Sequence, residues 1–94
     1  MPEYIRLIKK LRELCDNKSE LSGANPDIWS NYLAEPHHIR GRVGSLFLDP
    51  YNIILLTRFE HDIEEGKIRG EKIGKERLLQ LVKALRDKQG FKEV

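Results

Sequence analysis

The alternation of hydrophobic and polar positions predicts a helix at each end of the chain. Between Pro2 and Leu14, apolar residues recur at steps of three and four with charged residues between them, which is typical of an amphipathic helix. A second helical pattern runs from about Gly74 to Lys88 and ends before Gly90. The apolar stripe of this second helix consists of Ile73, Leu78, Leu81, Val82 and Leu85.

The middle of the chain has the shorter period of β-structure. Residues 34–40 and 52–57 are predicted strands, and the second is a β-branched and aliphatic run. Residues 41–51 contain glycines and an Asp-Pro turn, so we expect a long hairpin connection. A helix should follow from residue 58 or 59 to about residue 65, with Gly66 as its stop.

A loop and a short helix should precede the first strand. Residues 15–24 have the polar composition of a loop, and Asn25 followed by Pro26 predicts a helix start that continues through Trp29 and Leu33. We interpret Trp29 as a core anchor in preference to a platform for stacking bases. The expected fold class is α+β: a two-stranded antiparallel hairpin plus a helix, flanked by N- and C-terminal helices.

Composition adds limits to this picture. Ninety-four residues predict a single domain with a modest core, which a bound metal or a homodimer contact across the terminal helices would help to stabilise. The sequence has 34% charged residues, no apolar run near the ~20 residues that span a bilayer, and no signal-peptide pattern. Cys15 is the single cysteine, so no disulfide forms within the chain and a cytoplasmic location is expected.

Charge is unevenly distributed along the chain. Residues 1–66 hold eight Lys/Arg against eleven Asp/Glu, a balance of −3, whereas residues 67–94 hold nine against four, a balance of +5. The basic C-terminal part is either a phosphate-binding surface or an ordinary solvated helix face.

Three histidines and one asparagine are the candidate chemical groups. His37 and His38 are adjacent, Asn52 follows fourteen positions after His38, and His61 follows nine positions later. Two histidines can hold a divalent cation while a neutral imidazole beside it takes a proton from water, as phosphodiester hydrolysis requires. Neighbouring strand residues point to opposite faces, so His37 and His38 should have different roles, but the spacing does not assign them.

The segment from Glu35 to His61 resembles the HNH (His-Asn-His) endonuclease family, in residue types and in both gaps. The resemblance covers roughly residues 33–66 and implies a ββα-metal core. It makes His37 a metal ligand, His38 the general base and His61 a second ligand. Asn52 would brace the long loop that orients the base.

The resemblance further implies an enzyme that hydrolyses DNA phosphodiester bonds, by nicking or by double-strand cutting, with a single divalent ion. Mg²⁺ or Mn²⁺ is expected, and Zn²⁺ or Ni²⁺ would also suit such a site. Arg40 and Arg42 follow the histidine pair and are candidates for gripping DNA phosphates; otherwise they are exposed loop cations.

The chain departs from common family patterns at two places. Many relatives carry another histidine one turn after the last motif residue, where this chain has Glu65, which is either a third ligand or a surface acid. Many also bind a structural zinc through two Cys-x-x-Cys pairs. The corresponding positions are Cys15 with Lys18 and Thr57 with Glu60, which cannot form that site.

Two other functions compete with the nuclease hypothesis. One is a non-catalytic accessory protein that binds nucleic acid and keeps a metal for stability; such a protein would have no use for His38 as a base. The other is a helical interaction protein whose histidines are incidental, which would bind no metal.

Overall fold

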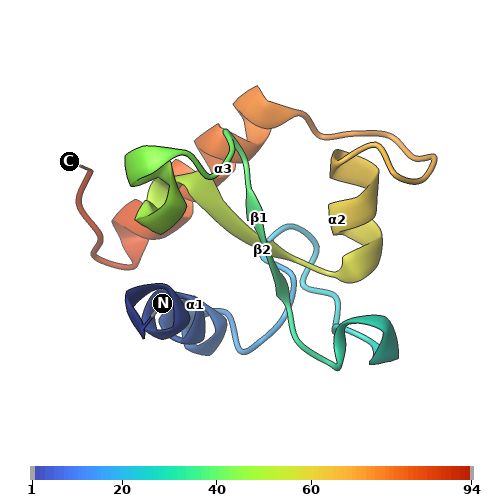
Figure 1. The fold of residues 1–94 in the computed structure, drawn as a ribbon, viewed down its shortest axis with the longest axis horizontal. Helices are drawn as coiled ribbons and strands as arrows, with labels where there is room; N and C mark the ends of the chain where they lie inside the picture. Colours follow the sequence, from blue (N-terminus) through green and yellow to red (C-terminus); the bar gives the residue numbers. More distant parts are fainter. Residues whose placement is uncertain (1, 94) are drawn as a thin grey trace.

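The computed structural model describes residues 2–93 and has an α+β fold in which a two-stranded antiparallel hairpin lies among three helices (Figure 1). The predicted order of helices and strands is confirmed. The elements are α1 (Pro2–Leu14), β1 (Glu35–His38), β2 (Ile53–Leu56), α2 (Arg58–Glu64) and α3 (Lys75–Lys88), with short 3-10 helices η1 (Ile28–Ser30), η2 (Gly44–Leu48) and η3 (Pro50–Asn52).

Strand β2 forms the centre of the core because both of its faces are covered. Successive side chains of a strand point to opposite faces. One face therefore packs against α1, in a cluster of Ile53, Leu55, Ile8, Leu11 and Ala34. The other face packs against α3, in a cluster of Ile54, Leu56, Ile39, Leu78 and Val82. The continuous aliphatic run in the sequence is thus explained by burial on both sides.

A buried ion pair ties the loop after α1 to α3 and to the outer edge of β2. Arg86 is completely buried, and its guanidinium donates to both carboxylate oxygens of Glu20 at 2.6 and 2.7 Å. The Glu20 carboxylate also accepts from the backbone N–H of Leu55 at 2.9 Å, and the Glu20 N–H donates to the Leu55 carbonyl. Glu20 therefore completes the hydrogen bonding of an edge strand that would otherwise be open.

The structure corrects the prediction for residues 25–33. The helix there is only the 3-10 turn η1, and Asp27, not Asn25, caps it by accepting from the N–H of Trp29. Trp29 is 78% exposed, so its interpretation as a core anchor was wrong. The 3-10 turn is too short to carry this side chain into a core that α1 and α3 already fill. No helix within residues 2–93 combines the length and apolar character needed to cross a membrane.

Candidate metal centre

The hairpin register separates the two adjacent histidines. His37 pairs with Ile54 and His38 pairs with Ile53. Residues opposite each other in an antiparallel pair share a face. His37 therefore lies on the side of the hairpin that α3 covers, and His38 lies on the side that α1 covers. The two side chains therefore point to opposite faces of the hairpin, as predicted.

Helix α2 brings two more candidate ligands to His37. A capping box fixes its start: the Thr57 hydroxyl accepts from the N–H of Glu60, and the Glu60 carboxylate accepts from the N–H of Thr57. His61 and Glu65 are four residues apart and so share one face of the helix. The capping residues Thr57 and Glu60 stand where many HNH proteins have a Cys-x-x-Cys pair.

His37, His61 and Glu65 converge on one point. The rings of His37 and His61 lie 5.1 Å apart between centroids, edge to face, and one donor atom from each of the three residues lies within 4.8 Å of the others. Ligands of a single ion bound at ~2.1 Å lie somewhat closer together than this, so small side-chain rotations would complete the site. The donor set of two imidazoles and a carboxylate fits a divalent transition metal.

Glu35 and Arg58 hold the His61 ring in place. The Nδ1 atom of His61 lies 3.0 Å from the Glu35 carboxylate, and Arg58 Nε donates to the other Glu35 oxygen at 2.9 Å. The His61 Nε2 atom lies 2.8 Å from Glu65. A carboxylate at one ring nitrogen sets the tautomer and leaves the second nitrogen for an ion. Glu35 was not among the predicted site residues, although its position two residues before His37 places it on the same strand face.

The His38 ring is fixed in a different environment, on the α1 side of the hairpin. It stacks on Tyr4 and Phe47 at centroid distances of 5.7 Å, and only 8% of the residue is exposed. Its Nε2 lies 3.3 Å from the Phe47 carbonyl. A carbonyl only accepts, so Nε2 carries the proton and Nδ1 carries the lone pair. Nδ1 is buried and has no hydrogen-bond partner among residues 2–93.

Both adjacent histidines favour the neutral form. Burial lowers the pKa of His38 below its usual value, and the nearby charge of Arg42 lowers it further. Burial also lowers the pKa of His37, with a contribution from the neighbouring His61. A neutral imidazole is the form required of a metal ligand and of a general base.

Asn52 holds the loop between the strands. Its side chain is fully buried: Oδ1 accepts from the Arg40 N–H at 2.7 Å, and Nδ2 donates to the carbonyls of Gly41 and Leu46 at 2.8 and 3.0 Å. Leu46 immediately precedes Phe47, whose carbonyl orients His38. These hydrogen bonds of Asn52 therefore fix the loop that carries Phe47.

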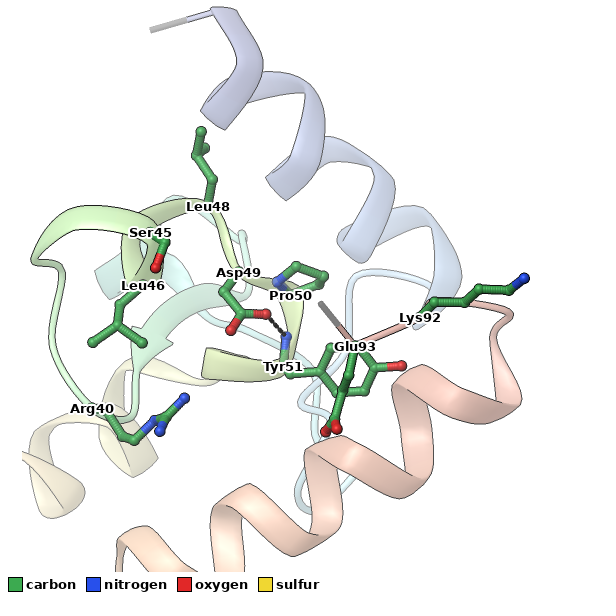
Figure 2. Close-up of a pocket in the computed structure, with 9 residues that line it drawn as sticks. All are labelled: Arg40, Ser45, Leu46, Leu48, Asp49, Pro50, Tyr51, Lys92 and Glu93. Carbon is green, nitrogen blue, oxygen red and sulfur yellow. Dashed lines mark hydrogen bonds between the residues drawn. The ribbon is translucent and has the colours of Figure 1, made fainter.

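The two arginines of this loop are both exposed, and neither forms an ion pair with another residue between positions 2 and 93. Arg42 is close enough for its charge to affect the pKa of His38. The Arg40 side chain instead lines an open pocket of about 670 Å³ beside Tyr51 and Glu93 (Figure 2), which contains none of the three histidines. Of the two arginines, Arg42 is therefore the one whose charge reaches His38.

Comparisons of the chain with protein-family models, with curated proteins and with solved structures found no match.

Proposed function

We propose that the chain is a metal-dependent endonuclease of the HNH type that hydrolyses phosphodiester bonds in DNA. The observation that carries this proposal is the convergence of His37, His61 and Glu65 on one side of the hairpin, while the adjacent residue His38 presents on the other side an Nδ1 without a hydrogen-bond partner among residues 2–93. The hairpin followed by α2 supports a ββα-metal core, with Asn52 in the bracing position.

In this proposal His37, His61 and Glu65 hold one divalent ion. When bound, the ion would offset negative charge on the scissile phosphate and on the leaving oxygen. Two imidazole ligands favour Mn²⁺, Zn²⁺ or Ni²⁺ over Mg²⁺, which prefers oxygen ligands. The third ligand in this proposal is Glu65, because its carboxylate lies within 4.8 Å of both imidazole donors.

His38 is the general base. Its Nδ1 takes a proton from water while the water oxygen forms a bond to phosphorus. The bond from phosphorus to the leaving sugar oxygen breaks, and that oxygen takes a proton from solvent. The Nε2–H group continues to donate its hydrogen bond to the Phe47 carbonyl, so the His38 ring keeps its orientation when it becomes protonated. Because Tyr4 and Phe47 cover the ring, one of them must shift for water to reach Nδ1.

Cleavage of supercoiled plasmid DNA tests the proposal. Wild-type chain and the His38→Ala variant are compared in EDTA, Mg²⁺, Mn²⁺ and Zn²⁺, with metal affinity measured in parallel by calorimetry. We expect metal-dependent nicking or linearisation by wild type only, with metal affinity nearly unchanged in His38→Ala. Loss of metal affinity in this variant would show that the roles of the histidine pair are wrongly assigned.

A non-catalytic accessory protein predicts a different result. Plasmid would be bound but not cut with any of the metals, and His38→Ala would behave as wild type. Absence of both metal binding and plasmid binding would instead favour the helical interaction protein.

A further inference from the structure

An exposed aromatic groove lies next to the candidate metal centre. Trp29, the single tryptophan, and Phe59, which is 61% exposed, line an open groove of about 480 Å³. Ile68, Arg58, Asp27 and Asp62 complete its lining. Neither aromatic ring belongs to the two core clusters. Large apolar side chains gathered on a surface without a role in the core indicate a binding site.

The groove adjoins the proposed site of hydrolysis along α2. Successive helix residues are ~100° apart, so Arg58 and Asp62 fall between Phe59 on one side and His61 with Glu65 on the other. Arg58 belongs to both regions, because it lines the groove and donates to Glu35, which in turn contacts His61. A ligand bound at the metal centre can therefore extend along α2 into the groove.

Charged residues surround the groove. Ile68 lies in it, and its exposed neighbours in the chain are Arg69 and Lys67, whose Nζ lies 3.8 Å from the Glu65 carboxylate of the candidate centre. This segment is held against α2, since a Cβ at Gly70 would lie only 2.6 Å from the side chain of Ile63. Of the two groove acids, Asp27 already accepts from the Trp29 N–H. Asp62 remains able to accept a hydrogen bond from a base amino group.

We propose that Trp29 and Phe59 stack an unpaired base of the nucleic-acid strand whose phosphate is cut at the metal centre. This inference rests on the proposed function and specifies its substrate class: single-stranded DNA, or duplex with unpaired nucleotides. Every base has a face that stacks on aromatic rings, whereas a paired base has both faces occupied by its neighbours. Continuity with the candidate centre through Arg58, together with two adjacent aromatic faces, favours a nucleic acid over a protein as the occupant.

Fluorescence of the single tryptophan reports this contact directly. The chain is titrated in EDTA, where no metal-dependent cleavage occurs, with a single-stranded 12-mer, a blunt duplex and a fully abasic strand of the same length. We expect quenching of Trp29 by the single strand and little quenching by the other two. In anisotropy measurements Trp29→Ala and Phe59→Ala should bind the single strand about 5- to 100-fold more weakly. Trp29→Phe should retain most of the affinity, and Ile5→Ala, which removes an exposed apolar side chain from α1, should bind as wild type.

Several outcomes would overturn the inference. These are equal quenching by the abasic strand, unchanged affinity of Trp29→Ala, or a change in emission that depends on protein concentration alone, which would place a second copy in the groove. The inference and the nuclease proposal fail separately. Base-dependent quenching without metal-dependent cleavage of either plasmid or the single-stranded 12-mer would keep the groove and reject the enzyme. Cleavage without quenching would do the reverse.

Discussion

Replacement of Glu35 by alanine gives the sharpest test of how the metal centre is built. Glu35 does not belong to the proposed ligand set, but its carboxylate lies 3.0 Å from Nδ1 of His61 and 2.9 Å from Nε of Arg58. Without it, the His61 ring has no partner at Nδ1 to fix its tautomer and rotation. Loss of such an outer carboxylate typically weakens metal binding by about 10- to 100-fold. That loss corresponds to ~1.4–2.7 kcal/mol.

Calorimetric titration with Mn²⁺ and Zn²⁺ measures this loss. Glu35→Gln keeps an oxygen that can accept from Nδ1 and should recover part of the affinity. Glu13→Ala, which removes an exposed glutamate from α1, is the matched control and should bind metal as wild type. Melting temperatures recorded in EDTA show whether each variant is folded before metal is added.

A double-mutant cycle decides whether Glu35 acts through His61. If it does, Glu35→Ala should cause little further loss of metal affinity in a His61→Ala background. The reasoning is refuted if Glu35→Ala alone leaves the affinity unchanged, or if its full effect persists without His61. The second result would make Glu35 a direct ligand in its own right.

Four further results are expected from the same geometry. Arg86→Met leaves the buried Glu20 charge unpaired and should lower the free energy of unfolding, measured in urea, by about 3–5 kcal/mol. The control Arg77→Met changes an exposed arginine and should have little effect, so equal effects of the two variants would contradict a structural role for the pair. Tyr4→Ala removes the ring that stacks on His38, so it should raise kcat for plasmid cleavage and lower the melting temperature. A loss of cleavage as large as that of His38→Ala would show that Tyr4 does not merely cover the base. Burial lowers the pKa of both vicinal histidines in the folded chain, so the unfolded chain binds more protons as the pH falls. The free energy of unfolding of the metal-free chain should therefore be highest above about pH 6.5 and decline below it, and a urea midpoint at pH 5.5 that equals or exceeds the midpoint at pH 7 would refute this. Circular dichroism in EDTA should show a folded chain that unfolds cooperatively, because neither hydrophobic cluster includes a proposed ligand. The spectrum of a disordered chain would instead favour a metal-stabilised accessory protein.

Local patterns in the sequence were sufficient to predict the elements around the hairpin. The aliphatic run of β2 and the stripes of α1 and α3 reflect periodic burial, which is a property of neighbouring positions. The placement of Trp29 could not be obtained in this way. The exposure of Trp29 depends on the space left between α1, β2 and α3, and the tertiary packing of these elements determines that space.

In the candidate site too, local sequence patterns identified some residues, whereas other contacts form only in the tertiary structure. His37 and His61 were singled out from their spacing and from the resemblance, and α2 does bring them together. The Glu20–Arg86 pair spans 66 residues and carries no signal that marks either partner. The stacking of Tyr4 on His38 joins two elements far apart in the chain, so only the tertiary structure reveals that the candidate base is covered.

Stability and proposed chemistry depend on different parts of this small fold. In HNH proteins with two Cys-x-x-Cys pairs, which this sequence resembles in part, zinc would cross-link the segments that correspond to the loop after α1 and the start of α2. Here protein contacts join the same two segments: Ser22 Oγ donates to the Glu60 carboxylate at 2.5 Å, and Glu20 connects the loop to β2 and to Arg86. The proposed metal ligands, His37, His61 and Glu65, lie outside both hydrophobic clusters. An ion bound there would stabilise the folded chain through its binding free energy without being part of either cluster, and in the proposed function it would offset charge on the scissile phosphate.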